Sequence, residues 1–258
     1  MRIALFSDIH ANLPALEVMF HSMESEKPDA IYCLGDLVGY NTWPNEVVSE
    51  IRRRGIPVIK GNYDQGIGLN IDECGCAYKT EREKEMGKIS ISYTNSVIGQ
   101  AEREYLRCLP SHIRVEFRSA ENETVTLLLV HGSPRRVNEY LFEDRDEKSL
   151  LRIMTDAEAD IMCFGHTHKP FHRVLHAGAT GTAVYRHAIN TGSVGKPKDG
   201  DPRGCYVILS LNADIDLSDP GSVQVQFVRF NYDIEKAAAA IKNSPLPDEY
   251  AAMLRKGA

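Results

Sequence analysis

The chain has 258 residues, of which 43% are hydrophobic and 26% are charged, and its formal net charge is -6. This composition is typical of a globular protein, and a chain of this length buries enough apolar surface to fold without disulfides or structural metals. The acidic balance argues against a broad nucleic-acid-binding surface and against attraction to acidic membranes.

The first sixty residues alternate between apolar, strand-like runs and helical segments. Asn12 precedes Leu13 and Pro14 and is expected to cap the first helix. The expected order is a strand at 2–7, a helix from residue 13, a strand at 30–35, a helix at 44–54 and a strand at 56–60. This order predicts parallel strands joined by helices.

Residues 65–111 interrupt this alternation. Glycines predict a loop at first, mixed charges fill 79–88, and a helix is expected at about 89–109. Mixed charge runs are typical of solvated faces, so we interpret the segment as a solvated helical insertion, with an interaction helix as the alternative. Because the insertion begins soon after Asn62, it is also placed to cover a site there. We expect the whole chain, 1–258, to form a single domain.

Strands dominate the second half of the chain. A polar turn at 119–122 is expected to join the first two. The expected strands cover residues 112–118, 123–130, 160–165, 171–175, 183–189, 205–211 and 223–230. Two short helices follow, at 233–242 and 247–255. The pattern predicts an α/β protein with two sheets packed face to face and helices outside.

The cysteines and the N-terminus indicate the compartment. No C-x-x-C pattern occurs, and the one close pair, Cys74-Gly75-Cys76, is expected in a solvated turn, with a weak metal or redox element as the alternative. The N-terminus shows no secretory signal pattern. No apolar run approaches the roughly 18–20 residues of a membrane span. We therefore expect a cytoplasmic protein in a reducing environment, with no membrane partner.

Seven residues that offer oxygen or nitrogen ligands follow five of the apolar runs. They are Asp8, His10, Asp36, Asn62, His131, His166 and His168. Ligands of α/β sheets bind outside the carboxyl ends of the strands, so we expect these side chains to meet at one rim. One metal ion rarely needs seven protein ligands, whereas two ions that share a bridging carboxylate do.

The chemical mixture of this set indicates which metals it suits. Carboxylate and amide oxygens suit hard cations, and imidazole suits transition metals. The set therefore favours two divalent or trivalent ions, manganese or iron, with zinc or nickel as alternatives. No cysteine takes part, which argues against a structural zinc site. Paired metals clamp both oxygens of an in-line displacement and generate hydroxide at neutral pH, so we expect hydrolysis of a phosphate ester.

Five short motifs occur in order along the chain. They are Asp8-Ile9-His10, Gly35-Asp36-Leu37-Val38-Gly39, Gly61-Asn62-Tyr63-Asp64, His131-Gly132 and Gly165-His166-Thr167-His168. They resemble the five motifs of the calcineurin-like metallophosphoesterase superfamily. Three longer stretches, beginning at His10, His131 and Asn190, are similar to its bacterial branch of small predicted phosphodiesterases, which includes diadenosine-tetraphosphatase-like proteins.

This resemblance implies a four-layer α/β/β/α sandwich and a role for each ligand. The first metal would be held by Asp8, His10 and His168. The second metal would be held by Asn62, His131 and His166, and Asp36 would bridge both metals. A hydroxide bridging the metals would attack phosphorus in line, and the catalytic residues Asn62 and His131 would also stabilise the phosphate oxygens.

The chain departs from the best-known family pattern at two linked positions. Many members carry histidine where Tyr63 lies and aspartate where Gly39 lies, and that pair is thought to assist the leaving group or the phosphate. Without it, monoesters with poor leaving groups are expected to be slow, and diesters or anhydrides are favoured. Asp64 is a candidate hydrogen-bond partner for a ligand histidine.

Basic residues near these loops are candidates for substrate binding. We prefer Arg135 and Arg203, because arginine binds phosphate through two parallel hydrogen bonds. Ordinary solvated charge is the alternative for both. Lys196 and Lys198 lie in the same loop region as Arg203, and we rank them lower.

The combined interpretation is a dinuclear-metal phosphoesterase that cleaves phosphodiester or phosphoanhydride bonds in a small nucleotide-type substrate. Tyr140 and Phe142 would then stack on a base, or they would close a sheet edge. A phosphomonoesterase, including a protein phosphatase, is the alternative within the same class. A non-catalytic metal-binding scaffold is the alternative outside it, since fold does not fix function. Nucleic acid is not an expected partner, and the oligomeric state stays open.

Overall fold

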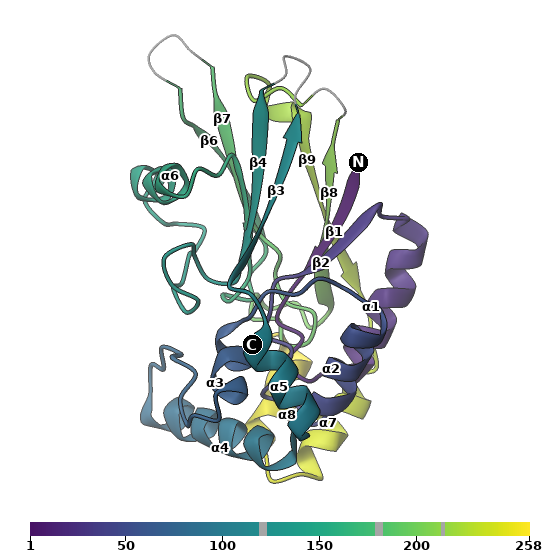
Figure 1. Ribbon diagram of the computed structural model, residues 1–258. Coiled ribbons are helices and arrows are strands. Elements are labelled where there is room, and N and C mark those ends of the chain that lie inside the picture. Colours follow the sequence, from purple (N-terminus) through teal and green to yellow (C-terminus); the bar gives the residue numbers. More distant parts are fainter. Residues whose placement is uncertain (119–122, 179–182, 213–214) are drawn as a thin grey trace.

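Two mixed β-sheets lie face to face, and helices cover their outer sides (Figure 1). This computed structural model describes residues 1–118, 123–178, 183–212 and 215–258. The first sheet has the strand order β2-β1-β8-β9, and the second has the order β3-β4-β5-β7-β6. Each sheet contains parallel and antiparallel pairs, so the predicted architecture of two mixed sheets flanked by helices is confirmed.

In the first sheet, β1 pairs in parallel with β2 and antiparallel with β8, which pairs antiparallel with β9. Its strands are β1 (Arg2–Phe6), β2 (Ala30–Cys33), β8 (Gly204–Leu211) and β9 (Val223–Phe230). In the second sheet, β4, β5 and β7 run parallel, with antiparallel strands at both edges. Its strands are β3 (His112–Arg118), β4 (Thr124–Val130), β5 (Ile161–Phe164), β6 (Phe171–His176) and β7 (Tyr185–Asn190).

Eight helices are found in the described residues. They are α1 (Leu13–Glu26), α2 (Pro44–Arg53), α3 (Asn62–Gly68), α4 (Glu81–Val97), α5 (Gln100–Cys108), α6 (Glu147–Asp156), α7 (Ile234–Lys242) and α8 (Asp248–Lys256). Asn12 caps α1 as expected, since its side chain accepts a hydrogen bond from the backbone N–H of Ala15 at 3.2 Å. A 3-10 turn, η1 (Pro220–Ser222), precedes β9.

Three apolar clusters hold these layers together. The cluster between the sheets contains Leu5 and Val207 from one sheet and Leu129 from the other. A second cluster joins the outer face of the first sheet to α1, α2, α7 and α8. The third packs α6 against the outer face of the second sheet through residues such as Leu150 and Met162. The result is four layers in the order α/β/β/α, as the resemblance implied.

The structure differs from the sequence expectations in the region between 56 and 111. The strand expected at 56–60 is reduced to a single bridge between Val58 and Cys33, because Pro57 has no N–H to donate. The loop expected after Asn62 is helix α3. The Asp64 carboxylate accepts a hydrogen bond from the N–H of Gly61 at 2.9 Å, and this N-terminal cap outweighs the poor helix propensity of the nearby glycines.

The expectation of a solvated insertion is also wrong in part. Instead of one helix from about residue 89, the chain forms α4 and α5, and α4 begins eight residues earlier, where Thr80 caps it through the N–H of Glu83. Met86, Ile91 and Leu106 of these helices are buried in the same cluster as α1 and α2. Figure 1 shows α4 beside α3, α5 and α8 at the end of the molecule below the sheets.

Helix α6 was not expected from the sequence, although Asp146 provides a cap by accepting a hydrogen bond from the N–H of Ser149. The turn expected at 119–122 lies outside the described residues. Within the described part of the chain, no helix combines the length and the apolar character that crossing a membrane requires.

Candidate metal centre

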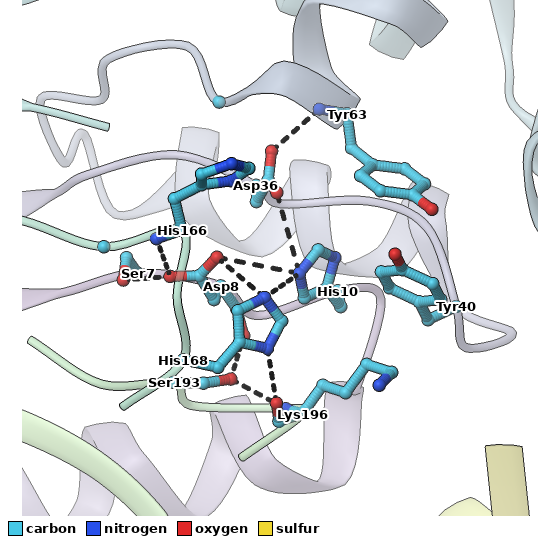
Figure 2. A network of polar contacts seen from close by, with 12 residues as sticks. Ser7, Asp8, His10, Asp36, Tyr40, Tyr63, His166, His168, Ser193 and Lys196 are labelled. Carbon is cyan, nitrogen blue, oxygen red and sulfur yellow. Dashed lines mark hydrogen bonds and ion pairs between the residues drawn. The ribbon is translucent and has the colours of Figure 1, made fainter. Parts of the chain in front are cut away.

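The loops that follow β1, β2, β4 and β5 bring two groups of buried side chains together, each with ligand atoms within 4.8 Å of one another. The first group is Asp8, His10 and His168, and the second is Asp36, His131 and His166. Figure 2 shows Asp8, His10, Asp36 and His168 pointing toward one another. The rim predicted from the strand ends is therefore present.

In the first group, three ligand atoms converge on one point. Nε2 of His10 lies 3.2 Å from Nε2 of His168. Oδ1 of Asp8 lies 3.2 Å from Nε2 of His168 and 3.7 Å from Nε2 of His10. The other carboxylate oxygen, Oδ2, accepts hydrogen bonds from Ser7 Oγ at 2.5 Å and from the N–H of His166 at 3.0 Å. These two bonds orient Oδ1 toward the histidines.

The tautomers of these histidines follow from their backbone partners. Nδ1 of His10 lies 3.0 Å from the carbonyl oxygen of Val38, and Nδ1 of His168 lies 2.5 Å from that of Lys196. A carbonyl only accepts, so each Nδ1 carries the proton and each Nε2 directs a lone pair into the group. Two facing lone pairs and the carboxylate Oδ1 of Asp8, which has no hydrogen-bond donor among the described residues, fit a bound cation.

The second group is built in the same way. Nδ1 of His131 donates to the carbonyl of Leu34 at 2.8 Å, so its Nε2 faces inward. Nε2 of His166 is buried and has no hydrogen-bond partner in the described part of the chain. The Nδ2 group of Asn62 donates to the carbonyl of Cys74 at 2.8 Å, which turns Oδ1 toward Nε2 of His131 at 3.2 Å. Three further ligand atoms thus lie ready for a cation.

Asp36 belongs to the second group and also faces the first. Its Oδ1 accepts a hydrogen bond from the N–H of Tyr63 at 2.8 Å. Its Oδ2 lies 3.6 Å from Nε2 of His10 and 3.4 Å from Nε2 of His131. One carboxylate oxygen is therefore shared by both groups, which is the geometry that a bridging ligand needs.

The backbone of this centre is strained. Five of the seven candidate ligands adopt left-handed φ angles, which only glycine adopts without cost. They are Asp8 (φ 54°), His10 (48°), Asp36 (56°), His166 (67°) and His168 (59°). Each residue in this conformation lowers the free energy of unfolding. Such residues cluster at functional sites, where the function requires the conformation. The centre therefore depends on the surrounding structure to hold these loops in place.

Burial keeps two of the four histidines neutral. Burial lowers the pKa of both His166 and His168 to about 3, helped by His131 in the first case and by Lys198 in the second. Burial also lowers the pKa of His131, but the facing Asp36 carboxylate outweighs it and raises that pKa to about 9. The neutral imidazoles of His166 and His168 are in the form that binds a metal.

For the two carboxyl groups of the centre, burial and the neighbouring histidines shift the pKa in opposite directions. Burial by itself raises the pKa of Asp8 and Asp36. The facing histidines, chiefly His168 for Asp8 and His131 for Asp36, outweigh burial and hold the pKa of both carboxyl groups below the ordinary range. Both carboxyl groups therefore stay ionised, which is the form in which a carboxylate binds a metal.

Asp64 holds two of these loops together. Its carboxylate accepts hydrogen bonds from the N–H groups of Asp36 at 2.7 Å, Leu37 at 2.8 Å and Gly61 at 2.9 Å. The expectation that it partners a ligand histidine is therefore wrong. Its role is to tie the loop after β2 to the start of α3, which fixes the spacing between Asp36 and Asn62.

The two predicted substrate-binding arginines lie in different surroundings. Arg135 lines a cavity of about 730 Å³ that also contains His131, and its guanidinium pairs with Glu139, with Nε at 3.0 Å from Oε2. Arg203 pairs with Asp201, with Nη2 at 2.7 Å from Oδ2. It does not line this cavity. Arg135 thus lines the same cavity as one ligand, His131, whereas Arg203 does not.

The sequence interpretation missed several residues around the centre. Cys74 is buried, and Sγ of Cys76 lies 3.3 Å from Nδ2 of Asn62, so the expectation of a solvated turn is wrong. Tyr40 packs edge-on against His10, with ring centres 4.7 Å apart. Nothing in the local sequence signals these contacts, because they join segments that are distant along the chain.

Comparison with known proteins agrees with this geometry. Residues 1–214 match the calcineurin-like phosphoesterase superfamily domain, so the chain belongs to this family. It is 30% identical over 259 residues to an uncharacterized protein of Methanocaldococcus jannaschii, a match that covers 95% of this chain and 94% of the relative. The predicted family is therefore confirmed. Together with the two buried groups, this membership makes the protein a metal-dependent phosphoesterase and indicates a dinuclear metal site.

Solved structures show the same architecture. A metallophosphoesterase from Sphaerobacter thermophilus is similar with a TM-score of 0.72 at 26% identity, and the match covers 100% of this chain and 99% of that one. A hypothetical protein from Pyrococcus horikoshii OT3 matches with a TM-score of 0.78 at 22% identity, covering 100% of this chain and 98% of that one. The second comparison shows the fold alone.

Proposed function

We propose that this protein is a phosphohydrolase that cleaves phosphodiester or phosphoanhydride bonds in a small, nucleotide-type substrate. The observation that carries the proposal is the position of Asp36. Its Oδ2 atom is shared between Nε2 of His10 at 3.6 Å and Nε2 of His131 at 3.4 Å. A carboxylate placed between two sets of inward-facing ligands is suited to hold two cations close together.

In this proposal each side chain has a defined role. Asp8, His10 and His168 hold the first cation, and Asn62, His131 and His166 hold the second. Asp36 joins the two. When bound, the two cations lower the pKa of water and neutralise charge on phosphate oxygens. The mixture of imidazole and oxygen ligands suits manganese or iron best, with zinc or nickel as alternatives.

The residues themselves bind and orient the substrate. Asn62 and His131 would act on the phosphate through the second cation, which they would hold against the oxygens where charge develops. Their own N–H groups already donate to the carbonyls of Cys74 and Leu34. Arg135 lies in the cavity beside His131 and supplies a guanidinium for an outer phosphate oxygen. The six free cysteines are in keeping with a cytoplasmic location.

The choice of diester or anhydride over monoester rests on Tyr63 and Gly39. These residues provide neither the imidazole nor the carboxylate that would assist a poor leaving group. The Tyr63 hydroxyl is buried and makes no hydrogen bond among the described residues, and burial raises its pKa well above the ordinary value. It is therefore a weak proton donor, and substrates whose leaving group needs little protonation are favoured.

The test is a comparison of two chromogenic substrates with purified protein. Release of nitrophenol from bis(4-nitrophenyl) phosphate and from 4-nitrophenyl phosphate is measured with added Mn²⁺ and with EDTA. We expect metal-dependent cleavage of the bis-ester to be faster than that of the monoester by about tenfold or more, a difference of about 1.4 kcal/mol in activation free energy. Faster cleavage of the monoester would shift the assignment to a phosphomonoesterase, and no cleavage of either would support a non-catalytic scaffold.

A further inference from the structure

A second cavity, of about 460 Å³, opens beside the candidate metal centre. Its walls include Tyr40, Tyr140, Lys196 and Lys198. The Tyr40 ring lies 4.7 Å from the ring of His10, and the Tyr140 ring lies 4.0 Å from that of His166, measured between ring centres. Two wall residues of the cavity therefore pack against the ligand groups, Tyr40 against the first and Tyr140 against the second.

Two of the four lysines that line this cavity, Lys196 and Lys198, form no ion pair with the residues that the structure describes. Lys196 is 4% exposed, and its Nζ lies 4.9 Å from the ring centre of Tyr40, while Nζ of Lys198 lies 5.9 Å from the same ring. Among the residues that the structure describes, no carboxylate forms an ion pair with either ammonium group within 4.0 Å. Glu83 also lines the cavity, but its carboxylate accepts from the N–H of Lys79 at 2.7 Å. A buried, unpaired ammonium is costly.

Both lysines are fixed relative to the metal ligands. The carbonyl of Lys196 accepts the Nδ1–H of His168 at 2.5 Å, and the N–H of Lys198 donates to the carbonyl of His168 at 3.3 Å. Figure 2 shows the Lys196 side chain extending from this hydrogen bond toward Tyr40. An anion held by the two ammonium groups would therefore lie next to a phosphate held at the metal centre.

Aromatic side chains form the remaining wall of the cavity. Tyr140 and Phe142 are stacked, with ring centres 5.7 Å apart and planes 10° from parallel. Phe142 also lines the cavity and is 44% exposed. Stacked rings beside cations are the combination that binds a nucleobase together with its phosphates.

We propose that this cavity is the subsite for a second phosphoryl group of a nucleotide substrate, bound by Lys196 and Lys198, so that the preferred substrate is a nucleoside polyphosphate rather than a diester with one phosphate. The proposal rests on the proposed function for its account of the first phosphate. It adds that the substrate carries at least one more anionic group than the bis-ester probe. The aromatic wall binds the nucleobase of the same substrate.

The first experiment measures binding without turnover. Isothermal titration calorimetry in EDTA compares β,γ-methylene ATP with AMP for the unaltered chain, for Lys196→Met combined with Lys198→Met, and for the exposed control Lys236→Met. We expect the Kd of the double variant for β,γ-methylene ATP to rise by about tenfold or more, because at least one charge-assisted contact is lost. AMP binding should fall less, and the control should match the unaltered chain. Equal binding of β,γ-methylene ATP by all three proteins would overturn the subsite.

The second experiment measures selectivity in turnover. The ratio of kcat/KM for ATP to that for bis(4-nitrophenyl) phosphate, with Mn²⁺, should fall about tenfold in the double variant. An unchanged ratio counts against the subsite alone. Lysine-dependent binding with no metal-dependent turnover of any probe would overturn the proposed function and leave the subsite standing. If the double variant is misfolded by circular dichroism, Lys198→Met alone replaces it, because Lys198 is partly exposed.

Discussion

The ring of Tyr63 lies directly over Gly39. A Cβ atom added at Gly39 would come within 2.3 Å of Cδ1 of Tyr63, and Gly39 has a φ of +92°. These are the two positions at which the chain departs from the family pattern it resembles. Because the ring fills the space that any side chain at position 39 would need, the two departures are coupled: a tyrosine at 63 requires a glycine at 39.

This contact predicts a strong coupling between the two positions. Gly39→Asp alone should destabilise the fold by about 2 kcal/mol or more, because it adds strain at a positive φ and a steric clash. Combining it with Tyr63→His should recover part of that loss, with a coupling of about 1–3 kcal/mol. Urea unfolding of the unaltered chain, the two single variants and the double variant gives the free energies of unfolding for this double-mutant cycle. Additive effects would show that the ring does not occupy the space of a side chain at 39.

The same double variant tests the substrate preference. If the absent histidine and aspartate account for slow monoester cleavage, the double variant should gain rate on 4-nitrophenyl phosphate relative to the bis-ester, by roughly tenfold or more. Tyr63→Phe is the matched control, since it keeps the ring over Gly39 and removes only the hydroxyl. We expect its rates to stay near those of the unaltered chain. A large loss with Tyr63→Phe would make the hydroxyl a proton donor instead.

The shared carboxylate predicts the most damaging single change. Asp36→Asn keeps an oxygen for the Tyr63 N–H but removes the charge that both ligand groups face, so bis-ester turnover should fall about 10²–10³-fold or more. Glu24→Gln, at an exposed acid of α1, should have no effect. Near-normal turnover by metal-loaded Asp36→Asn would be incompatible with a bridging role.

Replacing each of the two arginines by alanine should have different effects on KM. Arg135 lines the cavity beside His131, whereas Arg203 pairs with Asp201 away from both cavities. Arg135→Ala should therefore raise KM by roughly tenfold with a smaller change in kcat, the loss of one charged contact to phosphate. Arg203→Ala should change KM less than twofold. Steady-state kinetics on the preferred substrate decides between them, and equal effects would contradict the placement of Arg203.

Much of this centre could be predicted from the sequence because it consists of local signals. Each ligand follows an apolar run of the sequence, most of these runs are strands, and the carboxyl ends of neighbouring strands meet at one edge. Asn12, which caps α1, is equally local. The two sheets packed face to face and the outer layers of helices followed from the alternation of elements and from the family resemblance, whereas the order of the strands did not.

The parts that the sequence did not predict depend on contacts between distant segments. Cys76 approaches Asn62 only because the segment after α3 folds back over the centre. Lys196 is buried against Tyr40 and Tyr250, which come from opposite ends of the chain, and a lysine in a polar loop gives no sign of this. Helix α3 formed where glycines predicted a loop, because a single side-chain cap from Asp64 decided the local conformation.

Metal removal should lower the stability of the folded protein. Ligands at 100 times their Kd stabilise a fold by about 2.7 kcal/mol, and 1 kcal/mol shifts Tm by roughly 2–4 °C in a chain of this size, so Mn²⁺ should raise Tm by about 5–10 °C over EDTA. Buried lone pairs that face one another without a cation, as at His10 and His168, give the physical reason. Differential scanning fluorimetry measures the shift, and an identical Tm with and without metal would argue against occupancy of the centre.

The central claim is that the seven ligands form one centre for two cations joined by Asp36. The most direct measurement is the number of metal ions per chain, by inductively coupled plasma mass spectrometry of Mn²⁺-loaded, gel-filtered protein, in parallel with bis-ester turnover. The account predicts about two ions per chain and a rate that follows occupancy of the second. Full activity with one ion per chain, or none, would contradict it.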